Sequence, residues 1–242
     1  MDKLFDILHE DEELLVINKP ADLVCHPTKG DEFSSLISRV RLHLGPDATP
    51  RLVNRLDRET SGVTVVAKTT EAARELGRIW ETRAVQKEYL AIVHGHVRKE
   101  RGLIEAPLGK DKQSRVVIKD CVRTDGSLAQ TEFIVERRFN RAEGACSFLR
   151  VLPRTGRKHQ IRIHLAHFGH PIVGDKLYGG DEDLYLALVE RRLTEAQRAK
   201  LILPSHALHA AAVRFTWRDV PAEFRCNPEP WFTDFCSAGE LV

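Results

Sequence analysis

One carboxylate in this chain stands between two arginines, which is a setting suited to nucleophilic chemistry. Asp57 lies between Arg55 and Arg58, in a stretch that reads Asn54-Arg55-Leu56-Asp57-Arg58-Glu59-Thr60-Ser61-Gly62. Neighbouring cations favour the ionised form of a carboxylate, and an ionised carboxylate can attack an electrophilic carbon. The same residue types also form ordinary exposed turns capped by their own side chains. The local sequence does not separate these two interpretations of Asp57.

A second segment gathers basic side chains without any acid. Between residues 150 and 162 the cations are Arg150, Arg154, Arg157, Lys158 and Arg162. Arginine can bind a carboxylate through two parallel hydrogen bonds, so Arg162 is a candidate partner for a buried acid; a phosphate contact and a solvated side chain are the alternatives. Arg157 and Lys158 are candidate phosphate contacts because of their charge. The two segments together predict an enzyme that binds an anionic substrate and reacts through one aspartate.

Tyr89 is a third candidate, because it follows Lys87-Glu88 and opens an apolar run. Its ring could stack on a planar ligand such as a base, although a tyrosine in a strand more often belongs to the core.

Metal and nucleotide motifs are missing from the sequence. The spacing of His159, His164, His167 and His170 matches no zinc site. There is also no phosphate-binding P-loop, no dinucleotide fingerprint and no serine-nucleophile elbow. We therefore predict chemistry without a metal or another cofactor.

Composition places the chain among ordinary globular proteins. It has 242 residues and a formal net charge of +2, so a nucleic-acid surface has to come from clustered charge. No apolar run approaches the roughly 20 residues of a membrane span, and the start shows no secretion signal, so we expect a cytoplasmic protein. Five cysteines without a C-x-x-C pair predict reduced thiols. We expect one domain over residues 1–242.

The elements that must hold these residues follow from the apolar spacing. Short β-branched runs predict strands at residues 14–18, 63–67 and 89–93. Helical spacing predicts helices at 33–44 and at 70–83, the second with Thr70 as its N-cap. Asp57 therefore belongs to a tight loop ahead of a strand.

The second half predicts more strand. Residues 97–128 are charged and rich in turn formers, so we expect an extended hairpin or loop arm that could act as a clamp. Residues 130–139 and 146–152 predict an antiparallel pair joined by a turn, and residues 181–201 predict one or two surface helices that end before Pro204. The tail from Val220 onwards predicts an irregular segment anchored by aromatic residues.

At these motifs the chain resembles the pseudouridine synthases, in the branch that acts on ribosomal and transfer RNA and carries the motif H-R-L-D-x-x-T-S-G. The resemblance spans nearly the whole chain. Besides residues 54–62 it covers Asn18-Lys19-Pro20, Lys87-Glu88-Tyr89, the segment 155–164, the segment 170–175 and Leu208-His209-Ala210. The family usually has His where this chain has Asn54, which still offers one donor and one acceptor. We therefore expect Asn54 to adjust the properties of the site without abolishing it.

The resemblance implies an α+β protein with the pseudouridine synthase fold: a mixed, mostly antiparallel central sheet flanked by helices, with an RNA-binding cleft. It implies no separate N-terminal RNA-binding domain. Asp57 would be the catalytic aspartate, Tyr89 would stack on the target base and Arg162 would pair with the Asp57 carboxylate. Arg55 would fill the space that the extruded base leaves. The reaction would isomerise uridine to pseudouridine in a stem-loop of rRNA or tRNA.

Two other classes stay open. A non-catalytic RNA-binding or chaperone protein would use the same basic surface, but it would leave the intact set of Asp57, Tyr89 and Arg162 unexplained. A glycoside or nucleoside hydrolase would need a second carboxylate, for which Glu59 is the only evident candidate. The sequence implies no protein partner, is compatible with a monomer and gives no sign of membrane association.

Overall fold

The computed structural model describes residues 5–27 and 35–242, and these form two compact units. Unit 1 comprises the described residues up to Glu88 together with His209–Glu229. Unit 2 comprises Tyr89–Leu208 and Pro230–Val242. Asp57 and Arg55 belong to unit 1, whereas Tyr89, Arg157, Lys158 and Arg162 belong to unit 2. A single domain over residues 1–242 stays a prediction.

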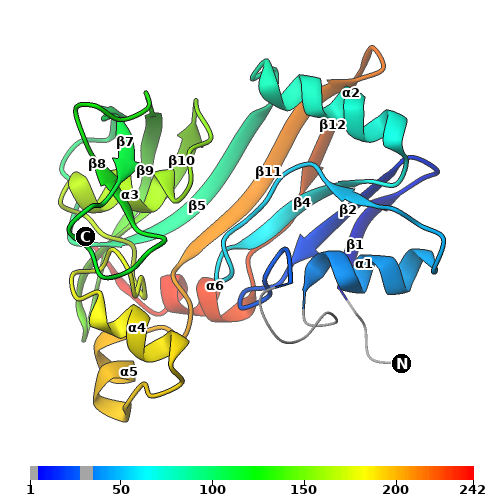
Figure 1. Cartoon of the computed structure of the whole chain (residues 1–242). Helices are drawn as coiled ribbons and strands as arrows, with labels where there is room; N and C mark the ends of the chain where they lie inside the picture. The colour runs from blue at the N-terminus through cyan, green and yellow to red at the C-terminus, as the bar shows by residue number, and fades with distance from the viewer. Residues whose placement is uncertain (1–4, 28–34) are drawn as a thin grey trace. The chain divides into compact units, whose positions relative to one another are not determined.

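Unit 1 is built on a mixed sheet (Figure 1). Its strands are β1 (Asp6–Glu10), β2 (Leu14–Lys19), β3 (Arg51–Leu52), β4 (Ser61–Ala67), β11 (Leu208–Trp217) and β12 (Val220–Arg225). The β4 and β11 pair is parallel, and the pairs β1 with β2, β2 with β4, β3 with β4, and β11 with β12 are antiparallel. All seven residues of β4 are buried, including the polar Ser61 and Thr64, and residues 63–67 are mostly β-branched, as strands favour. The predicted strands at 14–18 and 63–67 are confirmed.

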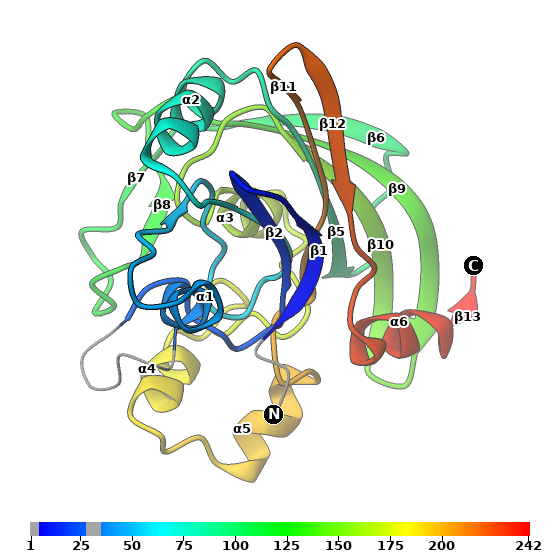
Figure 2. The same ribbon diagram turned by 90° about the vertical axis from the view of Figure 1, so that its right-hand side faces the viewer.

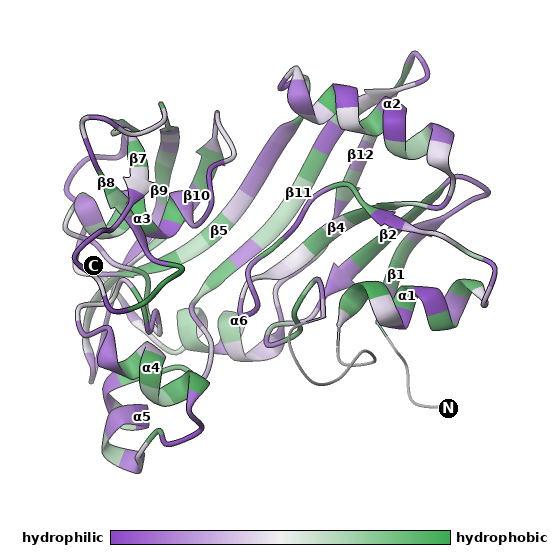
Figure 3. Cartoon of the chain, viewed as in Figure 1, coloured by the Kyte–Doolittle hydropathy of each residue, from purple (hydrophilic) through white to green (hydrophobic). Residues whose placement is uncertain are grey.

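Two helices accompany this sheet. Helix α1 (Leu36–Leu44) accounts for the predicted helix at 33–44, of which residues 33 and 34 lie outside the described residues. Helix α2 (Thr70–Glu81) alternates polar and apolar residues in Figure 3 and buries Ala72 and Leu76 against a cluster that includes Val63 and Val65. The prediction of Thr70 as N-cap is wrong by one position. Thr69 has the extended backbone of a cap, and its hydroxyl accepts from the Ala72 amide at 3.1 Å.

Unit 2 holds an antiparallel sheet, whose long strands β9 (Gln130–Arg141) and β10 (Gly144–Pro153) form the pair expected at 130–152 (Figure 2). β10 also pairs with β5 (Gln86–His94), which confirms the strand predicted at 89–93. β6 (Arg101–Glu105) and β13 (Glu240–Leu241) pair with β9. β7 (Leu108–Lys110) and β8 (Asp120–Val122) form a separate two-stranded sheet. The arm predicted at 97–128 is therefore only partly a separate hairpin, because β6 belongs to the larger sheet.

The helices of unit 2 are α3 (Gln160–His167), α4 (Asp183–Val189), α5 (Glu195–Leu201) and α6 (Pro230–Ser237). Helices α4 and α5 confirm the prediction at 181–201. The prediction of an irregular tail is wrong, because the tail folds into β12, α6 and β13. Its anchoring by aromatics is confirmed, since Phe232 and Phe235 are buried in the core of unit 2. Among the described helices none is long and apolar enough to cross a membrane. The α+β class with a mixed, mostly antiparallel sheet is confirmed.

Candidate active site

Asp57 opens a tight turn between β3 and β4. The Thr60 amide donates to the Asp57 carbonyl at 3.1 Å, which closes the turn, and Asp57 itself is half-buried. The exposed Arg58 donates from Nε to Oδ1 of Asp22 at 2.6 Å. Arg58 thus has a carboxylate partner that the sequence did not indicate. Arg55 is exposed on the same loop.

Asn54, which stands where the family usually has His, fastens this loop to β4. Its side-chain Nδ2 donates to the Val63 carbonyl at 3.1 Å, and its Oδ1 accepts from the Val65 amide at 2.7 Å. The Val53 amide meanwhile donates to the Val65 carbonyl at 2.9 Å. The carboxamide thus takes the place of a backbone peptide and extends the β3 and β4 pairing by one step. Asn54 uses both its donor and its acceptor, as its chemistry predicted, and it does so for positioning.

A buried lysine supports the other side of the turn. Lys19 at the end of β2 is fully buried, and its Nζ donates to the carbonyls of Pro20 at 2.8 Å, Leu23 at 2.9 Å and Arg58 at 3.1 Å. Burial lowers the Lys19 pKa to about 8, with partial opposition from Cys25, Glu229 and Asp57. Arg58 is the residue after Asp57, so the hydrogen bond from Lys19 to the Arg58 carbonyl holds the loop by its backbone.

We expect Lys19→Met to destabilise the protein by about 2–4 kcal/mol, because three carbonyls lose charge-assisted hydrogen bonds of about 1.5–3 kcal/mol each, which outweighs the relief of desolvation. Denaturant unfolding at pH 7 measures the loss. The pKa of Lys19 is lower in the folded protein than in the unfolded protein, so the native state binds fewer protons than the unfolded state between about pH 8 and 10.5. The wild type therefore gains stability as pH rises through that window. The variant should lack this gain. Equal stability of the two proteins at pH 7 would contradict the role given to Lys19.

Gly62 allows the strand that follows the turn to lie close to β11. Its φ is 115°, and a Cβ built there would fall 2.2 Å from the Ala210 carbonyl oxygen, so no other residue fits. Ser61 beside it hydrogen-bonds through Oγ to Nδ1 of His209 at 2.9 Å. Burial lowers the His209 pKa to about 4, so the neutral ring is kept near neutral pH. Ser61 and Gly62 therefore fix the chain against β11 at the point where the loop ends and β4 begins.

Arg162 lies on α3 in unit 2 and is buried, with 7% of its surface exposed. Its Nε and Nη2 donate to the two carboxylate oxygens of Asp175 at 2.7 Å and 2.8 Å. Asp175 Oδ1 also accepts from the amides of Leu177 and Tyr178, at 2.9 Å and 3.0 Å. The Tyr178 ring lies 5.0 Å from the guanidinium carbon. Asp175 and the Tyr178 ring therefore both restrain the orientation of the Arg162 guanidinium.

Asp175 is ionised in the folded protein. Its burial alone would raise its pKa, but the charge and hydrogen bonds of Arg162 hold the pKa well below the usual range. In the sequence Asp175 belongs only to the shared segment 170–175, and nothing there assigns it a role. A buried bidentate pair of this kind fixes the plane of the guanidinium as well as its position.

The two candidate phosphate contacts lie at the start of α3 and contact the arm. Lys158 Nζ lies 2.9 Å from Oδ2 of Asp120 on β8, and Arg157 Nε donates to the Leu128 carbonyl at 3.2 Å. Both side chains are exposed at least in part. Exposed pairs of this kind contribute little to stability, so a phosphate can replace Asp120 as the partner of Lys158.

Tyr89 lies in β5, is half-buried and packs against the apolar core of unit 2. The register places it opposite Val151 of β10. Partial burial leaves a stacking role for Tyr89 untested.

Comparisons with known proteins assign the chain to a family. The family model described as RNA pseudouridylate synthase matches residues 13–167, which include the Asp57 loop and Arg162. The chain belongs to the RNA pseudouridylate synthase family.

Individual relatives extend the match. The chain is 40% identical to ribosomal large subunit pseudouridine synthase D of Pseudomonas aeruginosa, over 90% of this chain and 64% of that protein. It is 35% identical to the dual-specificity RNA pseudouridine synthase RluA of Yersinia pestis, over 92% and 98%. The solved structure of human RNA pseudouridylate synthase domain containing 1 covers 100% of this chain and 91% of its own, with a TM-score of 0.77 and 25% identity.

The chain spans less than two thirds of several relatives that it matches. It covers 56% of an RNA pseudouridine synthase of Aquifex aeolicus and 64% of the Pseudomonas aeruginosa protein.

Proposed function

We propose that this chain is an RNA pseudouridine synthase, which isomerises specific uridines in structured rRNA or tRNA. The observation that carries the proposal is the Asp57 turn. It combines the family's Arg-Leu-Asp and Thr-Ser-Gly sequence with three independent backbone supports, from Asn54, Lys19 and the Gly62 approach to β11. A loop fixed so closely around one carboxylate suits a nucleophile whose position decides the rate.

In the proposed reaction the target uridine leaves the RNA stack, which costs a few kcal/mol and is least costly in loops. Asp57 attacks either C1′ of the ribose or C6 of the ring, and the N1–C1′ bond breaks. The base rotates and C5 bonds to C1′, the bond to Asp57 breaks, and the proton lost from C5 is balanced by protonation of N1. No cofactor is needed for these steps. Arg55 is proposed to occupy the space of the extruded base, which its exposure on the Asp57 loop supports.

The roles of the unit 2 residues rest on the family resemblance. We propose that Arg162 pairs with the Asp57 carboxylate in the active enzyme and that Tyr89 stacks on the target base. Asp175 would then be a positioning residue, because it holds the guanidinium of Arg162 by two hydrogen bonds. Binding of a planar base to an aromatic face is common in the recognition of unpaired RNA.

The substrate proposed is a stem-loop of large-subunit rRNA, with tRNA as the second choice. The Pseudomonas aeruginosa relative is named for the ribosomal large subunit and the Yersinia pestis relative for dual specificity. The same names suggest a cytoplasmic site of action.

Arg157→Ala combined with Lys158→Ala should weaken RNA binding and make it less dependent on salt. Removal of each phosphate contact should reduce the slope of log K against log salt by about 0.7–0.9. Filter binding of the target stem-loop between low and moderate salt measures the slope. Lys200→Ala, which removes an exposed lysine on α5, is the control for a general reduction in positive charge. An unchanged slope in the double variant would place the RNA path elsewhere.

The proposed function is tested by carbodiimide mapping of pseudouridine across rRNA and tRNA from cells that lack this protein. We expect one or a few sites to disappear and to return when the wild-type chain is supplied. If no site depends on the protein, the RNA-binding class without chemistry becomes the better account.

A further inference from the structure

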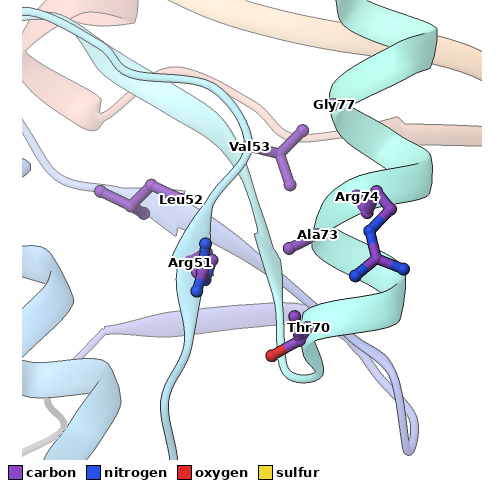
Figure 4. A pocket seen from close by; sticks show the side chains of 7 residues that line it. All are labelled: Arg51, Leu52, Val53, Thr70, Ala73, Arg74 and Gly77. Carbon is purple, nitrogen blue, oxygen red and sulfur yellow. The ribbon is translucent and has the colours of Figure 1, made fainter.

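Unit 1 contains a pocket whose lining includes none of the residues that we assign to the reaction (Figure 4). It has a volume of about 380 Å³. One side is formed by β3 and Val53, and the other side by the first two turns of α2. Its lining residues are Arg51, Leu52, Val53, Thr70, Ala73, Arg74 and Gly77. Two of these are arginines and none is acidic.

The two arginines enter from different elements. Figure 4 shows Arg51 on the strand side and Arg74 on the helix side, with Val53 and Ala73 between them. Both side chains are exposed, and within residues 5–27 and 35–242 neither forms an ion pair. Arg58 and Arg218 in the same unit do have carboxylate partners. The pocket therefore presents positive charge that no described carboxylate neutralises, which favours an anionic ligand.

Gly77 is a second observation that points to a ligand. It lies in the interior of α2, where glycine is among the least favourable residues. Neither packing nor backbone conformation requires it, because an added Cβ would meet no atom within 4 Å and its φ is not in the left-handed region. A glycine that the fold does not need leaves the pocket open on the helix side.

The pocket is connected directly to the Asp57 loop. Arg51 lies opposite Ala67 at one end of β4, and the loop that carries Asp57 rejoins β4 at Ser61. Six residues of chain lead from Arg51 to Asp57, and at about 3.3 Å per residue they span at most about 20 Å. An RNA strand that reaches Asp57 can therefore pass the pocket several nucleotides from the target uridine.

We propose that this pocket binds the sugar-phosphate backbone of the substrate RNA on one flank of the target uridine. A phosphate lies between the guanidiniums of Arg51 and Arg74, which suit the geometry of phosphate oxygens, and the Thr70 hydroxyl adds a donor. The ribose packs on the apolar floor of Val53 and Ala73. The proposal rests on the proposed function and names a part of the substrate that the reacting residues do not contact.

The test is steady-state kinetics of Arg51→Gln, Arg74→Gln and the double variant on the stem-loop that the mapping identifies. We expect the KM of the double variant to rise about tenfold with kcat unchanged, and the salt slope of binding to fall by about 0.7 because one phosphate is no longer bound. Arg41→Gln, which removes an exposed arginine on α1 that also lacks a described ion pair, is the matched control and should leave both values unchanged.

Two further comparisons separate the pocket from general effects. Gly77→Leu should raise KM by filling the pocket while the melting temperature stays equal or increases, and Gly77→Ala should change KM much less. On an RNA shortened to the nucleotides next to the target, wild type and double variant should have equal KM.

Wild-type KM in the double variant, or a fall in kcat in place of a rise in KM, would overturn the proposal. Failure of the proposed function would instead appear as a wild-type protein that forms no pseudouridine.

Discussion

Replacement of Asp57 by Asn should abolish pseudouridine formation, with a fall in kcat of about 10⁴-fold or more, while RNA affinity stays within a few-fold of wild type. Asn has nearly the same shape as Asp but has no carboxylate to attack carbon. The turn should keep its structure, because side chains of other residues fasten its backbone. The measurement is pseudouridine formation in single turnover, with RNA binding measured in parallel.

Asp22→Asn is the matched control for this variant. It removes the carboxylate that pairs with Arg58 in the same region, and the side chain of Asp22 is 64% exposed. The φ of Asp22 is 64°, a conformation that Asn adopts readily. We expect activity close to wild type. Appreciable product formation by Asp57→Asn would remove Asp57 from the mechanism.

The second large effect is expected at Asp175. Asp175→Asn should destabilise the protein by about 3–5 kcal/mol, because it removes the buried negative charge that Arg162 binds through two hydrogen bonds. Activity measured under conditions where the variant is folded should also fall, because Arg162 is no longer held in its orientation. Denaturant unfolding and single-turnover rates measure the two effects separately.

The pH dependence of this effect has a definite sign. Because the folded pKa of Asp175 lies below its unfolded value, the ion pair stabilises the protein above the unfolded pKa, and this contribution is lost as pH falls toward the folded value. Wild type should therefore lose stability on acidification more steeply than Asp175→Asn. Asp183→Asn, which breaks an exposed pair with Arg115, should change stability by no more than about 0.5 kcal/mol.

A double variant distinguishes a broken ion pair from a general packing defect. Arg162→Met with Asp175→Leu removes both charges, so it should be more stable than Asp175→Asn alone. It should nevertheless be inactive if Arg162 acts in the reaction. Wild-type stability in Asp175→Asn would contradict the role of this carboxylate.

The strands that carry the Asp57 loop could be predicted from sequence because their patterning is local. β2, β4 and β5 are short β-branched runs, and the pair of β9 and β10 is marked by a turn at the centre of a long strand-forming segment. The tail was misjudged because its prolines indicated an irregular chain. Pro221 instead lies in β12, which among the described strands pairs with β11 alone, and Pro230 is the first residue of α6, where a missing amide costs nothing.

The site was only partly accessible to sequence reasoning. Asp57 is a candidate from sequence because its motif is contiguous, and its catalytic role stays a prediction. The supporting contacts join residues that are far apart in the sequence. Asp175 lies 13 residues from Arg162, which it binds, and Lys19 lies 39 residues from Arg58, whose carbonyl it holds. The role of Asn54 depends on the register of β3 against β4, which local patterning does not specify. The buried partners and the strand register are therefore known from the structure and not from the sequence motifs.

The central claim is tested most directly by nucleoside analysis of RNA incubated with the purified protein. Target RNA is treated with wild type or Asp57→Asn, digested to nucleosides and separated by chromatography, and free uracil is measured in the supernatant. The account predicts that wild type converts uridine to pseudouridine without releasing uracil and that Asp57→Asn converts none. Release of free uracil would indicate a hydrolase, and pseudouridine formed equally by both proteins would contradict the assignment of Asp57.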